Sequence, residues 1–192
     1  MESVYDLLDE LDRVREQFLV AIESLPDEAL LQPGVIGTWS IADLMASIAV
    51  WEAELVTGLM QLDQGRKPTK LLQALANPDR FTAQRYEENK DRDLDRIFDD
   101  FQGVRVQLEG WVETFPEKAL LNPKQFPALG GRSLAHLIGA ASFKREQTYI
   151  AALKAFATRQ EAEAAATPPV TLIPLTAVMP LEQEDDNDNQ SD

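Results

Sequence analysis

The side chains best suited to chemistry begin in residues 37–52, GTWSIADLMASIAVWE, where Ser47 precedes Trp51 by about one helical turn. A small hydroxyl beside a large aromatic ring leaves room for a cavity or for a close crossing of two helices. A cavity there would be apolar with a few polar groups, as small-molecule sites usually are. The alternative is that the tryptophans are ordinary core residues and that Ser47 marks a tight contact.

A second stretch, residues 141–150 with the sequence ASFKREQTYI, carries an arginine and a glutamine close behind a phenylalanine. We expect this stretch to face residues 37–52, so that both helices line one pocket. The pocket candidates are Trp39, Ser47, Trp51, Tyr86, His136, Phe143, Arg145 and Gln147.

The single histidine, His136, occupies the third position of a predicted helix. The helix dipole disfavours imidazolium at that end, so a neutral His136 could act as a general base. It lacks a suitably spaced Asp or Ser, so we favour a surface or capping histidine. The carboxylates of Glu52, Glu54, Glu87 and Glu88 form no recognisable acid–base pair, and we expect them on solvated helix faces. The sequence therefore identifies no catalytic residue.

The composition excludes several classes of function. The chain has no cysteine, which removes disulfides, thiolate metal sites and a cysteine nucleophile, and which is typical of cytoplasmic proteins. Its net charge of −15 argues against nucleic-acid binding and against anionic membrane surfaces, because both need clustered Lys and Arg. No apolar run is long enough to cross a bilayer, and the acidic N-terminal residues do not resemble a secretory signal. We therefore expect a cytoplasmic protein that binds neither nucleic acid nor membrane.

Four long amphipathic helices account for most of the chain. Apolar residues recur in each at three- and four-residue steps, and Ser3, Ser40 and Ser133 are the predicted N-caps. Pro26 and Pro116 end the first and third helices. The predicted helices cover residues 3–24, 40–64, 94–115 and 133–158.

The two halves of the sequence resemble each other. LPDEALLQP at residues 25–33 recurs as FPEKALLNP at residues 115–123, and WSIADLMASI from Trp39 recurs more weakly as RSLAHLIGAA from Arg132. Two helical hairpins with the same loop chemistry predict an all-α, pseudo-symmetric four-helix bundle. Residues 65–92 are long enough for a crossover between helices 2 and 3, with short helices of its own.

The composition changes after Arg159. Residues 168–181, PPVTLIPLTAVMPL, are apolar and proline-spaced, whereas residues 182–192 are acidic and lack apolar side chains, as disordered segments do. We therefore predict a bundle domain at residues 1–159 and a Pro-rich, then acidic tail at residues 160–192 that is extended or disordered. The apolar part is either a linker lying on the bundle or a motif that docks on another protein.

The order and spacing of these motifs resemble the DinB-like superfamily of four-helix bundles, and within it the ClbS/DfsB type. The resemblance covers about residues 3–156. It rests on the pattern W-S-x-x-D-L-x-x-S-I-x-x-W-E from Trp39, the LPDEAL and FPEKAL loops, FTAQRYEENKDRDLDRIFDDF from Phe81 and the final ASFKREQTYI helix. Characterised relatives of the ClbS type resemble a self-resistance protein that opens a reactive cyclopropane in a genotoxic metabolite.

Metal-dependent relatives bind a divalent ion through three histidines. The resemblance places those positions at Ser47, Phe143 and Gln147, so all three ligands are missing. One histidine cannot make a three-His site, and a phenylalanine cannot bind metal. Members of the ClbS type also lack the triad. We therefore predict no metal and no other cofactor.

Three hypotheses for the function follow. The leading one is a metal-free, ClbS/DfsB-like domain that binds, sequesters or hydrolyses a small, reactive, largely apolar molecule. The alternative is a non-catalytic interaction or scaffold module that reaches a protein partner through its Pro-rich tail. A third is a structural protein that forms a homodimer, because related bundles often pair. Whether the protein is an enzyme is left open.

Overall fold

The computed structural model describes residues 3–166 of the 192. Within that range the chain is mainly helical, and its β pairing is limited to an isolated bridge between Ile36 and Trp39. The elements are α1 Val4–Ile22, α2 Asp27–Leu30, α3 Ile41–Asp63, α4 Thr69–Ala76, α5 Pro78–Asn89, α6 Leu94–Thr114, α7 Glu117–Leu121, the 3-10 turn η1 Pro127–Leu129, α8 Leu134–Ala141, α9 Phe143–Gln147 and α10 Ile150–Ala166.

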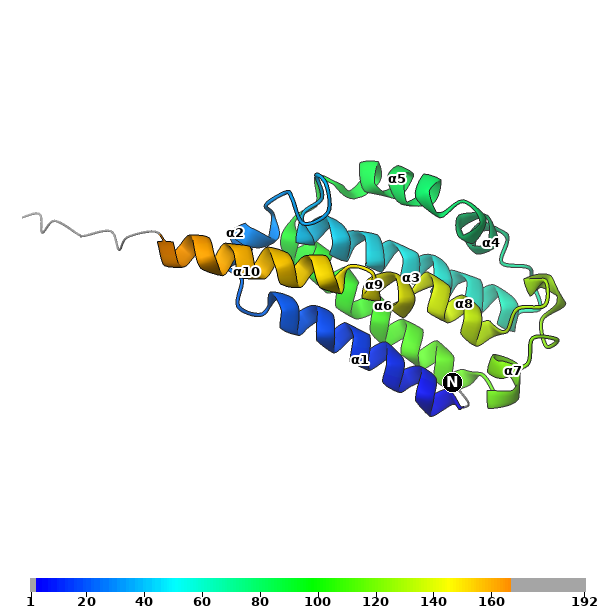
Figure 1. Ribbon diagram of the computed structural model, residues 1–192. Helices are drawn as coiled ribbons and strands as arrows, with labels where there is room; N and C mark the ends of the chain where they lie inside the picture. Colours follow the sequence, from blue (N-terminus) through cyan, green and yellow to red (C-terminus); the bar gives the residue numbers. More distant parts are fainter. Residues whose placement is uncertain (1–2, 167–192) are drawn as a thin grey trace, which may run out of the picture.

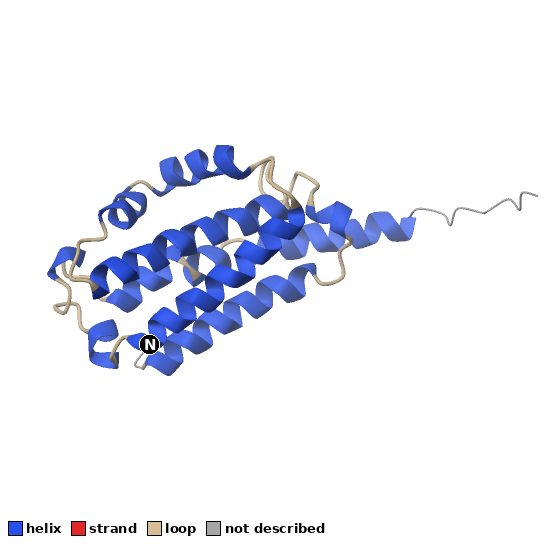
Figure 2. Cartoon of the chain, turned by 180° about the vertical axis from the view of Figure 1, so that it is seen from behind, coloured by secondary structure: helices blue, strands red, loops and turns tan. Residues whose placement is uncertain are grey.

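The long helices form the predicted four-helix bundle. Helices α1, α3 and α6 are three of its members, and α8, α9 and α10 follow one another as the fourth (Figure 1). The most extensive contact joins α3 to α6, whereas α1 packs against α9 and α10. Seen from behind, the drawn helices run side by side with the loops gathered at the two ends (Figure 2). The all-α fold expected from the sequence is confirmed.

The helices begin where the sequence predicts. Ser3 Oγ accepts a hydrogen bond from the Asp6 amide at 3.0 Å, and Ser40 Oγ accepts one from the Asp43 amide at 3.1 Å. Both aspartates bond back to the amide of the capping serine, which completes two capping boxes. Each serine cap stabilises its helix by about 1 kcal/mol. The start of α3 is therefore fixed locally, and with it the direction in which Ser47 and Trp51 project.

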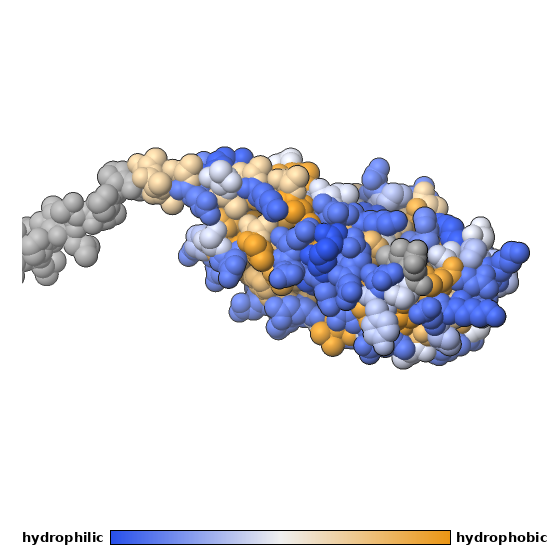
Figure 3. All heavy atoms as spheres, turned by 60° about the horizontal axis from the view of Figure 1, so that its bottom comes forward, coloured by the Kyte–Doolittle hydropathy of each residue, from blue (hydrophilic) through white to orange (hydrophobic). Residues whose placement is uncertain are grey.

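The apolar faces of these helices meet in a dry core. Its fully buried members include Leu7, Leu11, Phe18, Leu44, Met45, Ile48, Trp51, Leu55, Phe101, Leu108 and Phe156. Burying one such side chain contributes about 1.5–3 kcal/mol. The large apolar side chains that stay exposed are scattered, and the face that carries α1 is mainly hydrophilic with separate apolar spots (Figure 3).

The crossover between α3 and α6 consists of α4 and α5, which lie along the outer side of α3 (Figure 1). Gly58 allows α4 to come close, because a Cβ atom there would lie 2.6 Å from the Leu71 side chain. The helix α5 is different, since none of its residues is fully buried. It covers α3 through partly buried side chains alone.

The fourth helix departs from the prediction of one continuous element. Ser142, with φ −129° and ψ −109°, separates α8 from α9, and a turn at Thr148 and Tyr149 separates α9 from α10. The breaks change which side chains face the core. Thr148 is exposed, whereas Glu146 is fully buried.

Helix α10 continues to Ala166, so residues 160–166, predicted to begin the tail, are helical. Arg159 donates to the carbonyl oxygen of Gly34 at 3.3 Å, and Ser24 Oγ donates to Glu161 at 2.9 Å. These bonds join α10 to the loops at the far ends of α1 and α2. The Pro-rich and acidic tail predicted from residue 168 onward lies outside the described residues. No helix within residues 3–166 has the length and apolar character needed to span a membrane.

Candidate functional site

Trp51 is the centre of a cluster in which α3, α5 and α9 meet. Its indole Nε1 donates to Thr82 Oγ1 at 3.1 Å, and the Phe81 ring meets it edge-on with centroids 4.5 Å apart. From the other side, the Arg145 guanidinium carbon lies 3.7 Å from the centroid of the Trp51 ring. A cation in that position is attracted by the ring face. The side chain of Trp51 is thus buried and in contact with both neighbouring helices.

A second ring contact joins α5 to the start of α3. Trp39 and Tyr86 are stacked, with centroids 5.0 Å apart and an interplanar angle of 12°. Between this stack and Trp51 lies Ser47, whose Oγ is buried without a hydrogen-bond partner in the protein. It borders a hollow of about 10 Å³ lined by Asp43, Ala46, Ser47, Arg85, Tyr86, Asn89 and Lys90. Such a volume is about what one water molecule needs.

The larger opening lies on the outer side of this contact, between α3, α4 and α5. The groove has a volume of about 630 Å³, and its lining residues are Glu54, Lys70, Gln73, Ala74, Asn77, Arg80, Phe81, Gln84 and Arg85. Most of these side chains are polar or charged. The sequence predicted a pocket between the second and fourth long helices, whereas this groove is formed by the crossover.

Arg85 borders both the groove and the hollow beside Ser47. Its Nη1 donates to Glu88 at 2.6 Å, and its guanidinium carbon lies 5.2 Å from the centroid of the Phe81 ring. Its Nε is buried without a partner in the protein, as is Nε of Arg145. Arg85, Phe81, Trp51 and Arg145 therefore form a continuous run in which two rings in contact lie between two guanidinium groups.

Burial changes the acid–base behaviour of two groups at this site. Desolvation raises the pKa of Glu54, although Lys70 and Arg85 oppose it with their positive charges. Desolvation also lowers the pKa of Arg145, against the opposing influence of Tyr149 and Asp79. Both shifts show that water is partly excluded where α5 covers α3.

A separate network of charges occupies the centre of the bundle. Arg15 donates to Glu146 at 2.7 Å and to Glu52 at 3.2 Å. Arg105 donates from Nη2 to Glu52 at 2.5 Å and to Glu146 at 2.7 Å. Ser142 Oγ adds a hydrogen bond to Glu52 at 2.5 Å. Because both carboxylates are 0% exposed, the expectation that Glu52 lies on a solvated face is wrong.

The two arginines also bond to the backbone of neighbouring helices. Arg15 Nη1 donates to the carbonyl oxygen of Phe101, and Arg105 Nη1 to that of Leu11, each at 2.7 Å. Burial lowers the pKa of Arg105, but the nearby glutamate charges outweigh it and leave the pKa above its ordinary value. The charges cancel within the group, and all four bundle members are tied together.

The sequence contains a signal for this network. Glu52 follows Ile48 by four residues and precedes Leu55 by three, so it occupies an apolar position of its helix. Arg105 has the same relation to Phe101 and Leu108. Opposite charges at apolar positions of several helices indicate buried partners. Their pairing, however, depends on how the helices pack.

The structure separates the predicted pocket residues into two groups. Trp39, Ser47, Trp51, Tyr86 and Arg145 all lie along the contact of α3 with α5 and α9. The other three do not join them. His136 and Gln147 are exposed, and Phe143 is buried in the core, where its ring packs closely against Gly139.

The residues at the three-histidine positions do not fit a divalent ion. Ser47 lies beneath α5, Phe143 offers no donor atom and is buried, and Gln147 is at the surface. Across residues 3–166, no three side chains of His, Asp or Glu lie close enough together to hold a metal. The absence of a metal in the purified protein remains a prediction for direct analysis.

Comparisons with known proteins bear on the fold. A family model of the DinB superfamily matches residues 10–143. The chain is similar in structure to an uncharacterised protein from Escherichia coli UTI89, with a TM-score of 0.66, 13% sequence identity and coverage of 84% of this chain and 96% of the other. At that identity the likeness concerns the fold alone. No match is found among curated proteins.

Proposed function

This chain belongs to the DinB superfamily, and on that premise we propose that its bundle binds a small molecule where α5 lies over α3. The ligand occupies the groove between α3, α4 and α5 and reaches toward the hollow beside Ser47. The groove volume of about 630 Å³ lies within the range of about 300–1,000 Å³ that is usual for ligand sites.

The observation that carries this proposal is the placement of unpaired polar atoms. Within residues 3–166, the buried side-chain atoms that have no hydrogen-bond partner in the protein are Ser47 Oγ, Arg85 Nε and Arg145 Nε. Leaving such a group unpaired costs about 1–3 kcal/mol, so native proteins keep few of them. All three belong to the cluster around Trp51. A ligand with polar groups that occupies the groove and reaches the hollow offsets that cost at Arg85 and Ser47, whereas Arg145 lines neither cavity.

Helix α5 has the properties of a movable cover. It buries no side chain fully, and the stack of Trp39 on Tyr86 and the bond from Trp51 to Thr82 are among its main attachments to α3. Segments with few buried apolar contacts open at low free energy. Because the hollow beside Ser47 is far smaller than a ligand, a molecule that reaches this hydroxyl must displace α5.

The lining of the groove favours a polar ligand, whereas the sequence predicted a largely apolar one. Detoxification of the ClbS/DfsB kind is a narrower form of the proposal, because hydrolysis requires a base next to the reacting group. Asp43 borders the hollow, but its Oδ2 accepts hydrogen bonds from the amide and the hydroxyl of Ser40, both at 2.8 Å. The groups present therefore support binding better than hydrolysis.

A ligand search on full-length protein purified from its native host, read by native mass spectrometry, tests the proposal. The variant Arg85→Gln removes the arginine that borders both cavities. Arg13→Gln is its matched control, because Arg13 is also partly exposed and also bonds to a glutamate three residues away. We expect a co-purifying or added molecule that quenches the tryptophan fluorescence of the protein, binds Arg13→Gln normally and binds Arg85→Gln more weakly.

Two results would contradict this proposal. One is a search in which no molecule both binds and changes the tryptophan fluorescence. The other is a ligand whose affinity falls equally in the Arg85 and Arg13 variants, since the groove would then have no special role.

A further inference from the structure

We infer that the ligand of the groove between α3, α4 and α5 carries an oxyanion, such as a phosphate or a carboxylate. This inference rests on the proposed function, because it specifies the chemistry recognised at the same site. The net charge of the whole chain, −15, would by itself repel an anion. Recognition of an anion therefore depends on the local arrangement of charges in the groove.

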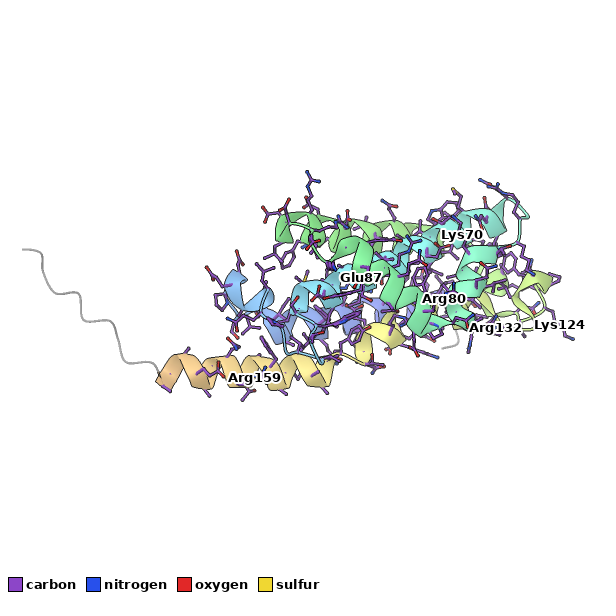
Figure 4. All side chains as sticks on the ribbon, turned by 90° about the horizontal axis from the view of Figure 1, so that it is seen from above. Lys70, Arg80, Glu87, Lys124, Arg132 and Arg159 are labelled. Atoms are coloured by element: carbon purple, nitrogen blue, oxygen red, sulfur yellow. The ribbon has the colours of Figure 1, made fainter. Side chains whose placement is uncertain are left out.

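The charged residues that line the groove are three cations and one carboxylate. Lys70 comes from α4, Arg80 and Arg85 come from α5, and Glu54 comes from α3. Lys70 and Arg80 are exposed and have no ion-pair partner within 4.0 Å among residues 3–166. Seen from above, both labelled side chains lie at one end of the crossover, with Glu87 farther along α5 (Figure 4). Glu54 lies near enough to Lys70 for their charges to interact, and Asp79 adjoins Arg80 in the chain, but among residues 3–166 neither carboxylate forms an ion pair with these two cations.

Arg85 adds a directional donor to this positive surface. Its Nη1 is engaged by Glu88, and its Nε is buried and still has a proton to donate. A guanidinium holds its donors in a fixed planar fork, which matches the oxygens of a carboxylate or phosphate. Charge-assisted bonds of this kind are stronger where water is excluded. Because this Nε is shielded from solvent, an oxyanion in the groove accepts from it only when the Arg85 side chain shifts and exposes the atom.

The remaining groups of the lining are compatible with an anion. Gln73 and Asn77 carry side-chain amides that donate hydrogen bonds, whereas the amide of Gln84 already donates to Glu88 at 3.1 Å. Burial raises the pKa of Glu54, so this carboxyl accepts a proton more easily than an exposed glutamate does. The groove thus combines several donors with a single carboxyl, whose charged form burial disfavours.

Amide NMR of the labelled full-length protein, at low ionic strength, provides the test. The probes are phenyl phosphate, benzoate and the neutral molecule phenol. We expect both anions to shift the amide signals of the lining residues, and phenol to bind about ten-fold more weakly, since a hydrogen bond between charged groups is lost. The stronger of the two anions identifies the site as one for phosphate or for carboxylate.

Charge variants locate the effect. Lys70→Gln and Arg80→Gln are each expected to weaken the anion by about two- to five-fold, the usual range for an exposed charge pair. Lys124→Gln removes the same charge from another exposed residue, which does not line the groove, and should leave binding unchanged.

Three outcomes would overturn the inference. If phenol binds in the groove as tightly as the anions, the oxyanion is not what is recognised, and the proposed binding function stands. If Lys124→Gln weakens binding as much as the groove variants do, the attraction is general. If none of the probes shifts the lining residues, no oxyanion is bound there, and the proposed function depends on the native-host search alone.

Discussion

Replacing Glu52 by glutamine should destabilise the bundle far more than the same change at an exposed glutamate. The change keeps the shape of the side chain but removes its charge. Glu52 accepts hydrogen bonds from Arg15, Arg105 and Ser142, and it is 0% exposed. After Glu52→Gln, the two arginines face only Glu146, so a net positive charge stays in a site that water does not reach.

The expected cost follows from that uncompensated charge. Removing one partner of a buried ion pair costs about 3–5 kcal/mol, whereas an exposed pair contributes about 0–1 kcal/mol. For a chain of this length, a loss of about 3–5 kcal/mol lowers Tm by about 6–20 °C. Such a loss is a substantial part of the total stability, which is about 5–15 kcal/mol for most domains.

Urea denaturation followed by circular dichroism measures this free energy of unfolding. Glu87→Gln is the control, because Glu87 is exposed and, within residues 3–166, forms an ion pair with Lys90 alone, at the end of α5. The double variant Arg15→Gln/Glu52→Gln restores neutrality and should be more stable than the sum of the two single effects predicts. A loss below about 1 kcal/mol for Glu52→Gln, or an equal loss for Glu87→Gln, would refute the reasoning.

Four further predictions concern packing, pH dependence, metal content and the tail. Gly58→Ala should destabilise the protein by about 1–3 kcal/mol, because its Cβ meets Leu71, whereas Gly103→Ala on an open helix surface should stabilise it by up to about 1 kcal/mol; urea denaturation decides both. Because burial raises the pKa of Glu54, the folded state binds that proton more tightly than the unfolded state, and stability is lost as pH rises through the raised value. In thermal denaturation, the stability of Glu54→Gln relative to the parent protein should therefore increase from about pH 4 to pH 7. A stability difference that stays constant with pH would contradict this. Elemental analysis should find no stoichiometric divalent metal, and removal of residues 168–192 should abolish binding of any protein partner that the tail recruits; zinc or nickel at one equivalent, or unchanged partner binding, would disprove these two expectations.

Most of the bundle was predictable because its determinants are local. The serine caps at Ser3 and Ser40, and the proline stops after α1 and α6, act within a few residues, and the apolar stripes follow the helical repeat. The duplicated loops LPDEAL and FPEKAL both became short helices, α2 and α7. The fourth helix was predicted as one continuous element, whereas it breaks at Ser142, whose side chain joins the buried charge network.

The candidate site was predictable only in part, because its members belong to different helices. Spacing along the chain indicated a candidate site at Ser47 and Trp51, but it could not show that α5 covers them. It also could not show that Arg85 would border two cavities, since this depends on the path of the crossover.

The sequence by itself determined that this chain forms a bundle of amphipathic helices, because caps, stops and periodicity are properties of neighbouring residues. Tertiary structure alone decided which charges are buried and which polar atoms remain unpaired. Arg15 and Glu146 are 131 residues apart in the chain yet share a hydrogen bond of 2.7 Å. The physical reason is that pairing between helices depends on their packing and rotation, which no single helix encodes.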